Sequence, residues 1–305
     1  MNSSRPVSTG SIFPPPRKRG LITLSSVIVV CGLAGTACLL FSMQQQVGAL
    51  FVIFLLLTIL FYVPIPLAAY RAYALTNASY TLERDGLRLR WGLRAEDIPL
   101  PEIEWVRPAA ELGFRLPLPL LAFAGGLLGA RILPELGLVE FVASEEKNLL
   151  LVATPRKVYA ISPADPGAFV HAFQRAIELG SLAPLPAYSS QPEAFLARVW
   201  RDAPARLLLL TGLGLTLGLL VLASLLIPGR AQISLGFNPA GLPLEAGPAA
   251  RLLLLPVLAA FCYVADLILG LFFYRNDPQR PVAYLLWVAG VLTPLLLIFA
   301  VIGLV

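Results

Sequence analysis

Charged residues are scarce in this chain of 305 residues: Lys, Arg, Asp and Glu make up 13% of it, whereas 57% of the residues are hydrophobic. An ordinary soluble domain carries about 25% charged residues, so this composition excludes one. It predicts a membrane protein, because uncharged helical runs of this length can cross about 30 Å of hydrocarbon. We expect five spans, at residues 21–43, 47–70, 207–227, 252–274 and 281–305.

Histidine and cysteine are also rare, and this limits the chemistry. The single histidine, His171, cannot build a His-based metal centre. The three cysteines, Cys31, Cys38 and Cys262, all lie in predicted spans, and none forms a pair at ligand spacing. No Gly-rich phosphate loop and no G-x-S-x-G motif occurs. The sequence therefore predicts a protein that is not an enzyme, with no catalytic residue, no metal and no cofactor.

The net charge of +5 is placed beside the spans and not in a nucleic-acid-binding patch. Residues 71–206 hold fifteen basic and fifteen acidic residues, so the middle of the chain is neutral. On one side of the membrane the spans are flanked by Arg17, Lys18, Arg19, Arg71, Arg206, Arg275 and Arg280. Only Arg230 and Arg251 fall on the other side. The positive-inside bias predicts that the N-terminus and the middle region lie in the cytoplasm and the C-terminus outside.

Between the second and third spans the pattern changes from unbroken apolar runs to alternation. In YTLERDGLRLRWG, at residues 80–92, large apolar residues alternate with Arg88 and Arg90, which predicts a strand after an Asp-Gly turn. PLPEIEWV continues the strand pattern. NLLLVATPRKVYAIS, at residues 148–162, predicts a second hairpin around its TPRK turn.

A helix is expected to follow this hairpin, in ISPADPGAFVHAF. Asp165 is a good N-cap and Pro166 a good first helical residue. Phe169 and Phe173 recur at helical spacing and give the helix one apolar face to pack against a sheet, with His171 on the polar side.

Together these segments, from YTLERDGLRLRWG to LLLVATPRKVYAISPADPGAFVHAF, resemble the bacterial pleckstrin-homology-like domains found in membrane proteins. The resemblance covers about residues 77–180. It implies an antiparallel sheet folded into a half-open barrel and closed by one C-terminal helix. The expected fold class is therefore a five-helix membrane protein with an inserted, cytoplasmic, β-rich domain.

The expected organisation has five parts: a disordered cytoplasmic tail (1–20), a transmembrane hairpin (21–71), the β-rich domain (77–180), a linker with an interfacial helix (181–205) and a three-helix membrane region (206–305) with an outside loop at 228–250. Within the domain, residues 109–137 are an oily insertion containing LPLPLLAFAGGLLGA. One interpretation is a loop that covers the open end of the sheet. The other is a loop that dips into the cytoplasmic leaflet.

A second resemblance concerns residues 227–275, beginning with IPGRAQISLGFNPAGLPLEAGPAARLLLLPV. This segment resembles the conserved membrane domain of Sdp-type immunity proteins through Asn238, Gly241 and Pro243. The family's histidine position is Gly236 here, which puts any role of that imidazole in doubt. The resemblance implies a sensor or immunity-type receptor that uses the outside loop 229–250.

Other candidate sites are each open to two interpretations. Asp266 is an acidic residue inside a predicted span. One interpretation is a hydrogen bond to a hydroxyl such as that of Thr211, Thr216 or Tyr263; the other is a proton-coupled role in a transporter. Gly214 and Gly218 form a G-x-x-x-G pair for packing within the chain or in a dimer.

Basic residues of the middle domain are candidates for contact with the membrane surface: Arg88, Arg90, Arg94, Arg115 and Arg131. The alternative is a solvated charged face. The leading hypothesis is a non-enzymatic, multi-pass protein of the bacterial inner membrane that presents its β-rich domain at the cytoplasmic leaflet for binding or scaffolding. Its partners would be the bilayer, anionic headgroups or another membrane protein, and not nucleic acid.

Overall fold

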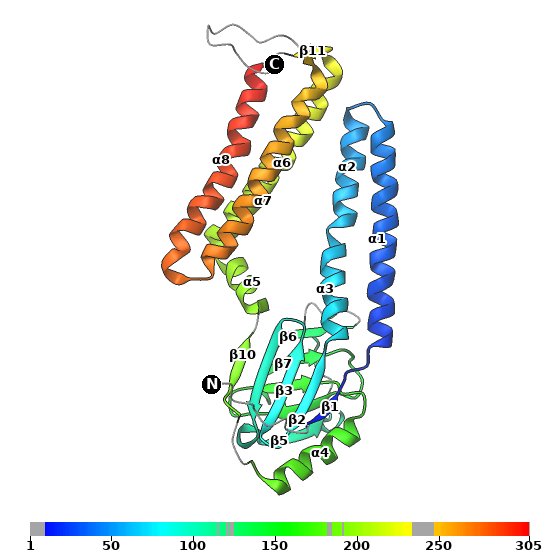
Figure 1. Cartoon of the computed structure of the whole chain (residues 1–305), viewed down its shortest axis with the longest axis vertical. Helices are drawn as coiled ribbons and strands as arrows, with labels where there is room; N and C mark the ends of the chain where they lie inside the picture. The colour runs from blue at the N-terminus through cyan, green and yellow to red at the C-terminus, as the bar shows by residue number, and fades with distance from the viewer. Residues whose placement is uncertain are drawn as a thin grey trace, which may run out of the picture. The chain divides into compact units, whose positions relative to one another are not determined.

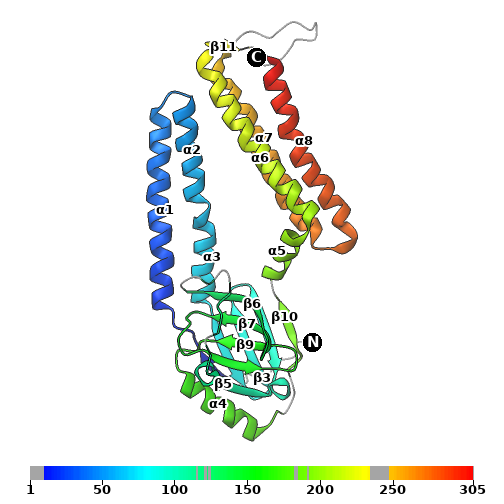
Figure 2. The same cartoon turned by 180° about the vertical axis from the view of Figure 1, so that it is seen from behind.

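The computed structural model describes residues 10–114, 116–119, 122, 125–181, 185–190, 192–233 and 247–304. Contacts divide the chain into two compact units, which are described separately. The first is built from Met1–Gly32 and Tyr62–Pro192, and the second from Leu33–Phe61 and Glu193–Val305. The first unit holds two five-stranded sheets, and the second holds helical residues between 33 and 61 together with the helices that follow the sheets (Figure 1, Figure 2).

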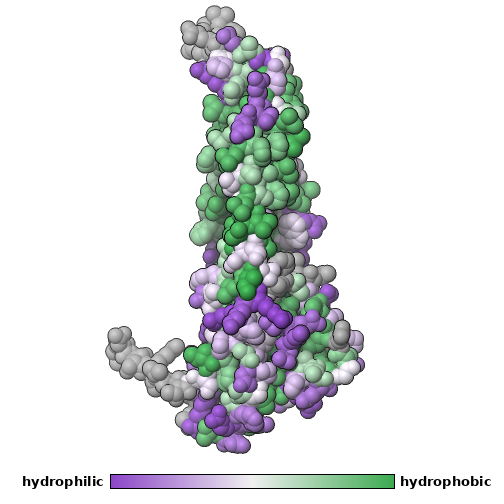
Figure 3. All heavy atoms as spheres, turned by 90° about the vertical axis from the view of Figure 1, so that its right-hand side faces the viewer, coloured by the Kyte–Doolittle hydropathy of each residue, from purple (hydrophilic) through white to green (hydrophobic). Residues whose placement is uncertain are grey.

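Five helical segments in the described part of the chain are long and apolar enough to cross a membrane, which confirms the predicted number. They are α1 (Lys18–Gln44), α2 with α3 (Ala49–Tyr62 and Pro64–Thr76), α6 (Ala203–Leu226), α7 (Leu254–Tyr274) and α8 (Arg280–Leu304). Pro64 and Pro66 lack the N–H groups that a continuous helix would bond, so α2 ends just before them and α3 begins at Pro64. Hydrophobic side chains cover the helices on the face drawn in Figure 3, and hydrophilic side chains gather over the sheets.

The two sheets have the orders β1-β2-β3-β4-β10 and β5-β8-β9-β7-β6. Their strands are β1 (Ser11–Phe13), β2 (Ser79–Glu83), β3 (Gly86–Trp91), β4 (Arg94–Pro99), β5 (Trp105–Pro108), β6 (Leu127–Leu133), β7 (Gly137–Ala143), β8 (Leu150–Ala153), β9 (Val158–Ile161) and β10 (Tyr188–Ser190). Neighbouring strands are antiparallel except β7 and β9, which are parallel. The sheets do not join into one closed barrel, so the expected half-open barrel is confirmed.

The main apolar core lies between the two sheets, and strand periodicity explains how it forms. In β8, Leu150 and Val152 face this core, whereas Leu151 and Ala153 face a second apolar cluster on the other side of the same sheet. Successive side chains of a strand point to opposite faces, and both faces of this sheet are covered, so all four side chains are buried. An unbroken apolar run is therefore the sequence signature of β8.

Helix α4 (Pro166–Leu179) closes the main core, as predicted. The Asp165 carboxylate accepts a hydrogen bond of 2.9 Å from the Ala168 amide, and Pro166 occupies the first turn. Phe169 and Phe173 are buried against the sheets. The N-cap satisfies an amide that the first turn would otherwise leave without a partner.

The expectation of a disordered tail over residues 1–20 is wrong for its second half. Residues Ser11–Phe13 form β1, which extends the first sheet by pairing with β2. The Phe13 ring packs edge-on against Phe169 at 5.1 Å, and the Pro14 carbonyl accepts a hydrogen bond from the Ala164 amide. One aromatic side chain and one free sheet edge are enough to order this segment, although its composition is that of a linker. Residues 1–9 lie outside the described residues.

The linker expected at 181–205 also contains a strand. Residues Tyr188–Ser190 form β10 and pair with β4, on the opposite edge of the first sheet from β1. The short helix α5 (Pro192–Arg201) follows, as expected, and leads into α6.

The insertion at 109–137 is only partly a loop, because residues Leu127–Leu133 form the edge strand β6. Its remaining apolar residues, including Leu112, Leu116 and Leu118, pack on the second cluster of the sheet β5-β8-β9-β7-β6. This packing agrees with the interpretation in which the insertion covers the sheet.

In the second unit, α6, α7 and α8 pack against one another, with α5 and two short strands, β11 (Gln232–Ile233) and β12 (Gly247–Pro248), beside them. Glycines make the helix contacts close. A Cβ placed on Gly212 of α6 would lie 2.9 Å from the Tyr263 ring of α7 and 3.1 Å from the Gly290 carbonyl of α8. A Cβ on Gly270 would lie 2.1 Å from Trp287 Nε1. Small residues at these points let the helix backbones approach.

Candidate functional site

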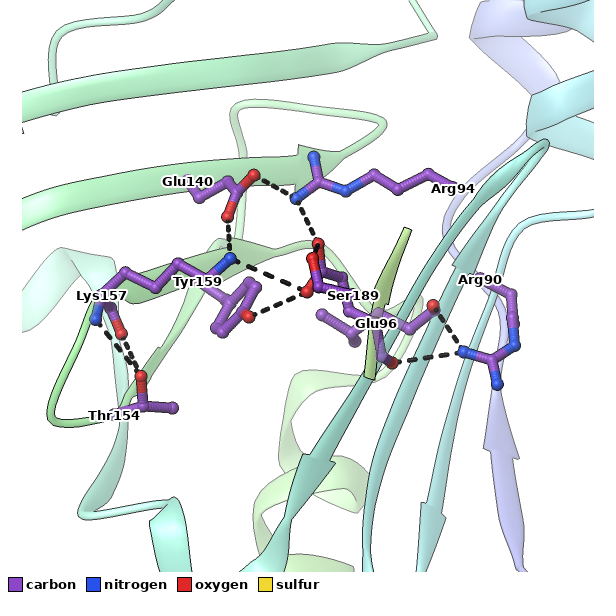
Figure 4. Close-up of polar contacts among 9 residues, drawn as sticks. Arg90, Arg94, Glu96, Glu140, Thr154, Lys157, Tyr159 and Ser189 are labelled. Atoms are coloured by element: carbon purple, nitrogen blue, oxygen red, sulfur yellow. Dashed lines mark hydrogen bonds and ion pairs between the residues drawn. The ribbon is translucent and has the colours of Figure 1, made fainter. Parts of the chain in front are cut away.

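Four charged side chains and a tyrosine lie between the two sheets of the first unit. Arg94 and Glu96 come from β4, Glu140 from β7, Lys157 from the turn before β9, and Tyr159 from β9 (Figure 4). We call these five residues the charge cluster. The side chains of Arg94, Glu96 and Glu140 are only 6%, 2% and 9% exposed. The cluster is therefore part of the interior of the domain.

Every charge of the cluster has a partner of opposite sign. Arg94 Nη2 contacts both carboxylates: Glu96 Oε1 at 3.3 Å and Glu140 Oε1. Lys157 Nζ lies 2.6 Å from Glu140 Oε2 and 3.7 Å from Glu96 Oε2. The Tyr159 hydroxyl donates a hydrogen bond of 3.1 Å to Glu96 Oε2. Two positive and two negative groups balance, as a buried set of charges must if it is not to destabilise the fold.

The cluster also holds the strand β10. The Ser189 hydroxyl donates a hydrogen bond of 2.9 Å to Glu96 Oε1 (Figure 4). Backbone pairing places Ser189 opposite Glu96, with Tyr188 opposite Asp97. Glu96 therefore connects both sheets and the segment that leads to α5. The ionic groups of the cluster pair with one another and tie the two sheets together.

No site was predicted from the sequence at Glu96, Glu140, Lys157 or Tyr159, and Arg94 was expected on the surface. A signal for burial was present in β4. Ile98 faces the core. Because side chains two residues apart in a strand lie on the same face, Glu96 and Arg94 must face the core as well. A buried apolar residue in a strand thus predicts that charged residues on the same face of that strand are buried too.

Two tyrosines between the sheets make the stability of this domain sensitive to alkaline pH. Burial, and next the Glu96 and Glu140 carboxylates, raise the pKa of Tyr159. Burial raises the pKa of Tyr80, whose hydroxyl donates a hydrogen bond of 2.7 Å to the Val142 carbonyl. The folded domain therefore holds both phenolic protons more tightly than the unfolded chain, in which tyrosine titrates near pH 10.

We expect the contribution of these two tyrosines to the free energy of unfolding to be constant below about pH 10 and to fall above it, by up to about 1.4 kcal/mol per pH unit for each tyrosine. Urea titrations of the detergent-solubilised chain, followed by hydrogen exchange of strand peptides, measure this slope. Replacing Tyr80 and Tyr159 with Phe should flatten it. Tyr188→Phe is the control, because that side chain is exposed. An equal slope in the double variant would contradict the assignment.

Comparison with known proteins agrees with this architecture. Residues 78–177 match the family model of the bacterial PH domain. Residues 78–177 form a bacterial PH domain. No curated protein and no solved structure matches the chain. The chain is therefore a membrane-type helical protein with an inserted PH domain, as the resemblance implied.

The described ranges contain no group of three or more His, Cys, Asp or Glu side chains placed to hold a metal ion. His171 is exposed on α4 of the PH domain.

The five arginines expected at the membrane surface have different environments. The prediction is wrong for Arg94, which is buried because its strand turns it between the sheets. Arg88 and Arg90 lie on the opposite face of the first sheet, where they form ion pairs with Glu83 at 3.3 Å and Asp97 at 2.6 Å. Arg131 Nε donates a hydrogen bond to the Leu118 carbonyl and so holds the insertion against β6. Arg115 lies outside the described residues. For Arg88, Arg90 and Arg131, contact with headgroups stays a prediction.

Asp266 lies on α7 beside Gly290 of α8: a Cβ on that glycine would lie 3.5 Å from Asp266 Oδ2. Within the part of the chain that the structure describes, two of the three hydroxyls expected to bond Asp266 have other partners. Tyr263 donates to the Leu209 carbonyl and Thr216 to the Gly212 carbonyl. The interpretation as a hydrogen bond to these two hydroxyls is therefore wrong, because both donate to carbonyls of α6. A role for Asp266 stays a prediction.

Among the described residues, Gly214 and Gly218 do not pack against another helix. A Cβ at either position would meet nothing within 4 Å, whereas Gly212 and Thr216 lie on the buried face of α6. Positions two residues apart on a helix differ by about 200°, so the G-x-x-x-G pair points away from α7 and α8. The interpretation as packing within the chain is wrong for these two residues.

Asn238, Gly241 and Pro243, the candidate residues of the outside loop, lie outside the described residues. A polar site at the other end of the bundle was missed. The Asp202 carboxylate, between α5 and α6, accepts hydrogen bonds from Tyr274 at 2.6 Å and from Tyr284. Burial works against ionisation of Asp202, but these hydrogen bonds, with that from the Ala205 amide, lower its pKa overall. Asp202 thus fixes the start of α6 to the ends of α7 and α8.

Proposed function

We propose that this chain is a non-enzymatic, multi-pass protein of the bacterial inner membrane that presents its PH domain at the cytoplasmic leaflet, where it binds lipid or protein and acts as a scaffold. One observation carries the proposal: the ends of two membrane helices are part of the core of the PH domain. Ala74 and Leu75 from α3 are buried in the same apolar cluster as the sheets, and Leu21 from α1 packs against it. A domain built onto two spans cannot leave the membrane surface.

The junction with α3 is short and tightly packed, which supports the same proposal. Helix α3 ends at Thr76, and β2 begins at Ser79. A Cβ on Gly92, in the turn after β3, would lie 2.7 Å from Ala74 Cβ, and Gly92 has a left-handed φ of 58° that favours glycine. Such a junction keeps the binding surfaces at one height above the bilayer. A domain tethered in this way meets membrane-bound partners at high local concentration, so a weak surface is sufficient for occupancy.

The charge placement supports a cytoplasmic PH domain. Arg17, Lys18 and Arg19 precede α1, and Arg71 lies near the end of α3, on the same side as the domain. The interior charges of the domain neutralise one another, which favours binding over catalysis.

The orientation can be tested on the full chain with single cysteines. We expect a cysteine in place of Glu104, which is exposed in the PH domain, to react with a membrane-impermeant maleimide only after spheroplasts are opened. A cysteine in place of Arg251, which precedes α7, is the matched control and should react in intact spheroplasts. The three native cysteines would be changed to Ser in both variants. Labelling of position 104 in intact spheroplasts would place the domain outside and end the proposal.

The binding task itself is tested by photo-crosslinking in cells. A photoreactive amino acid at Ile132 or Leu93, two strongly exposed apolar residues of the domain, should give defined adducts with a lipid or a membrane protein. Uniform, diffuse adducts at both positions would contradict a specific binding surface.

A further inference from the structure

A cavity of about 340 Å³ opens in the first unit where α1 begins, beside the insertion and the turn between β7 and β8. Arg19 and Gly20 line it from α1, and Leu118, Ala122, Gly125 and Leu127 from the insertion and β6. The segment Ser144, Glu145, Glu146 and Lys147 completes the wall. The cavity is separate from the charge cluster, with which it shares no residue.

Two glycines that line this cavity make a close backbone contact. A Cβ on Gly20 would lie 2.4 Å from the Gly125 Cα, and a Cβ on Gly125 would lie 2.6 Å from the Gly20 Cα. Gly125 also has a φ of 91°, which side-chain-bearing residues rarely adopt. The first turn of α1 and the insertion therefore form one wall whose position depends on two glycines.

The position of the cavity places it at a membrane boundary. Arg17, Lys18 and Arg19 precede the apolar run of α1, which starts at Leu21. Basic residues at this point of a span lie at the level of the lipid headgroups. A cavity lined by Arg19 and Gly20 is therefore within reach of a headgroup, and its apolar residues can contact the glycerol end of a lipid.

Four of the residues that line the cavity are charged: Arg19, Lys147 and Glu146, which are exposed, and Glu145, which is half-buried. Within the described residues, none of the four has an ion pair or a side-chain hydrogen bond. This contrasts with the charge cluster, where every charge is neutralised by a neighbour. Two cations and two carboxylates that share one cavity without pairing are arranged for a ligand that carries both signs.

We propose that this cavity binds the headgroup of an aminophospholipid, phosphatidylethanolamine. Arg19 and Lys147 bind the phosphate, and Glu145 and Glu146 accept hydrogen bonds from the primary ammonium group. Leu118, Ala122 and Leu127 contact the apolar part next to the headgroup. A purely anionic headgroup would meet two uncompensated carboxylates, so the balance of charges selects the zwitterion. The volume is at the small end of the range for ligand pockets, which fits a headgroup and not a whole lipid.

The proposal deepens the lipid-binding part of the proposed function and rests on it for the placement of the domain at the membrane. Its test does not depend on orientation or on protein partners. The purified full chain is equilibrated in mixed micelles with equal amounts of phosphatidylethanolamine, phosphatidylcholine and phosphatidylglycerol. The lipids retained by the protein are then counted by native mass spectrometry.

We expect phosphatidylethanolamine to be retained about five-fold over each of the other two lipids, the ratio that about 1 kcal/mol of headgroup contact produces. The variant Glu145→Gln/Glu146→Gln should lose the preference over phosphatidylcholine, because the trimethylated headgroup offers no N–H donor and the amides no longer attract the ammonium. The variant Arg19→Gln/Lys147→Gln should retain less of all three lipids. Hydrogen exchange of the β-strand peptides distinguishes a loss of lipid binding from misfolding, because the exchange rates of a folded variant must match those of the parent chain.

Matched controls come from the same domain. Glu102→Gln/Glu104→Gln makes the same change of charge at exposed positions away from the cavity, and Arg156→Gln controls for the loss of an exposed cation. Both should keep the preference. Equal retention of the three lipids by the parent chain, or a preference for phosphatidylglycerol, would overturn the proposal and leave the scaffold function standing. A preference that survives Glu145→Gln/Glu146→Gln would place the lipid elsewhere.

Discussion

Replacing Arg94 with Met is expected to lower the free energy of unfolding of the PH domain by about 3–5 kcal/mol, the usual cost of leaving a buried charge without its partner. Arg94 is the only cation of the charge cluster that contacts Glu96 closely, at 3.3 Å, and it also contacts Glu140. Without it, two carboxylates would share Lys157, which lies 3.7 Å from Glu96. Hydrogen exchange of the β4 and β7 peptides in the full chain, titrated with urea, measures the loss.

The contrast with an exposed ion pair gives the control for this prediction. Arg88 pairs with Glu83 at 3.3 Å, but its side chain is 35% exposed. Arg88→Met should therefore cost less than about 1 kcal/mol. In a double variant, Arg94→Met with Glu140→Gln removes one charge of each sign and should recover part of the loss. An Arg94→Met chain as stable as the parent would show that the charge cluster contributes nothing to the fold.

Replacing Gly270 with Ala is expected to destabilise the three-helix bundle by about 1–3 kcal/mol, the usual cost of overpacking a filled interior. The added Cβ would lie 2.1 Å from Trp287 Nε1 and 2.7 Å from two further atoms of that ring. The indole cannot move away easily, because Trp287 is 2% exposed and packs against the rings of Tyr274 and Tyr284. The temperature at which the detergent-solubilised chain loses its monodisperse peak measures the effect.

Gly218→Ala is the matched control in the same bundle. Its Cβ would meet nothing within 4 Å, and alanine is a better helix former than glycine by about 1 kcal/mol. The variant should melt at or above the temperature of the parent. If Gly218→Ala were as destabilising as Gly270→Ala, Gly218 would have to contact a helix of a second copy, which is the dimer interpretation of the G-x-x-x-G pair.

Elements with a strong local pattern could be predicted from the sequence. Strand β3 was predicted from the alternation of Leu87 and Leu89 with arginines, and α4 from Asp165 and Pro166. The spans could be predicted because twenty or more uncharged residues have no soluble alternative. In each case the information lies within a few neighbouring residues.

Elements defined by distant partners could not be predicted. Strands β1 and β10 are three residues long, too short for a periodic pattern, and each exists because a sheet edge lies within reach. The partner of β1 lies about seventy residues away along the chain and that of β10 more than ninety. The burial of Arg94 depends in the same way on Glu140 from another sheet. The close helix contacts fall on Gly212 and Gly270 and not on the G-x-x-x-G pair, because helix rotation in a bundle is decided by all three helices together.

The pairing of β1 with β2 has a consequence for how the protein is made. β1 leaves the ribosome before the first two spans, and β2 leaves it after them, so the edge of the sheet can be completed only when both spans have been inserted. The two strands must then be on one side of the bilayer. If only one of the two spans crossed the membrane, β1 and β2 would lie on opposite sides of it. Phe13 would then lose its contact with Phe169. Completion of the sheet of the PH domain therefore requires both spans to be inserted.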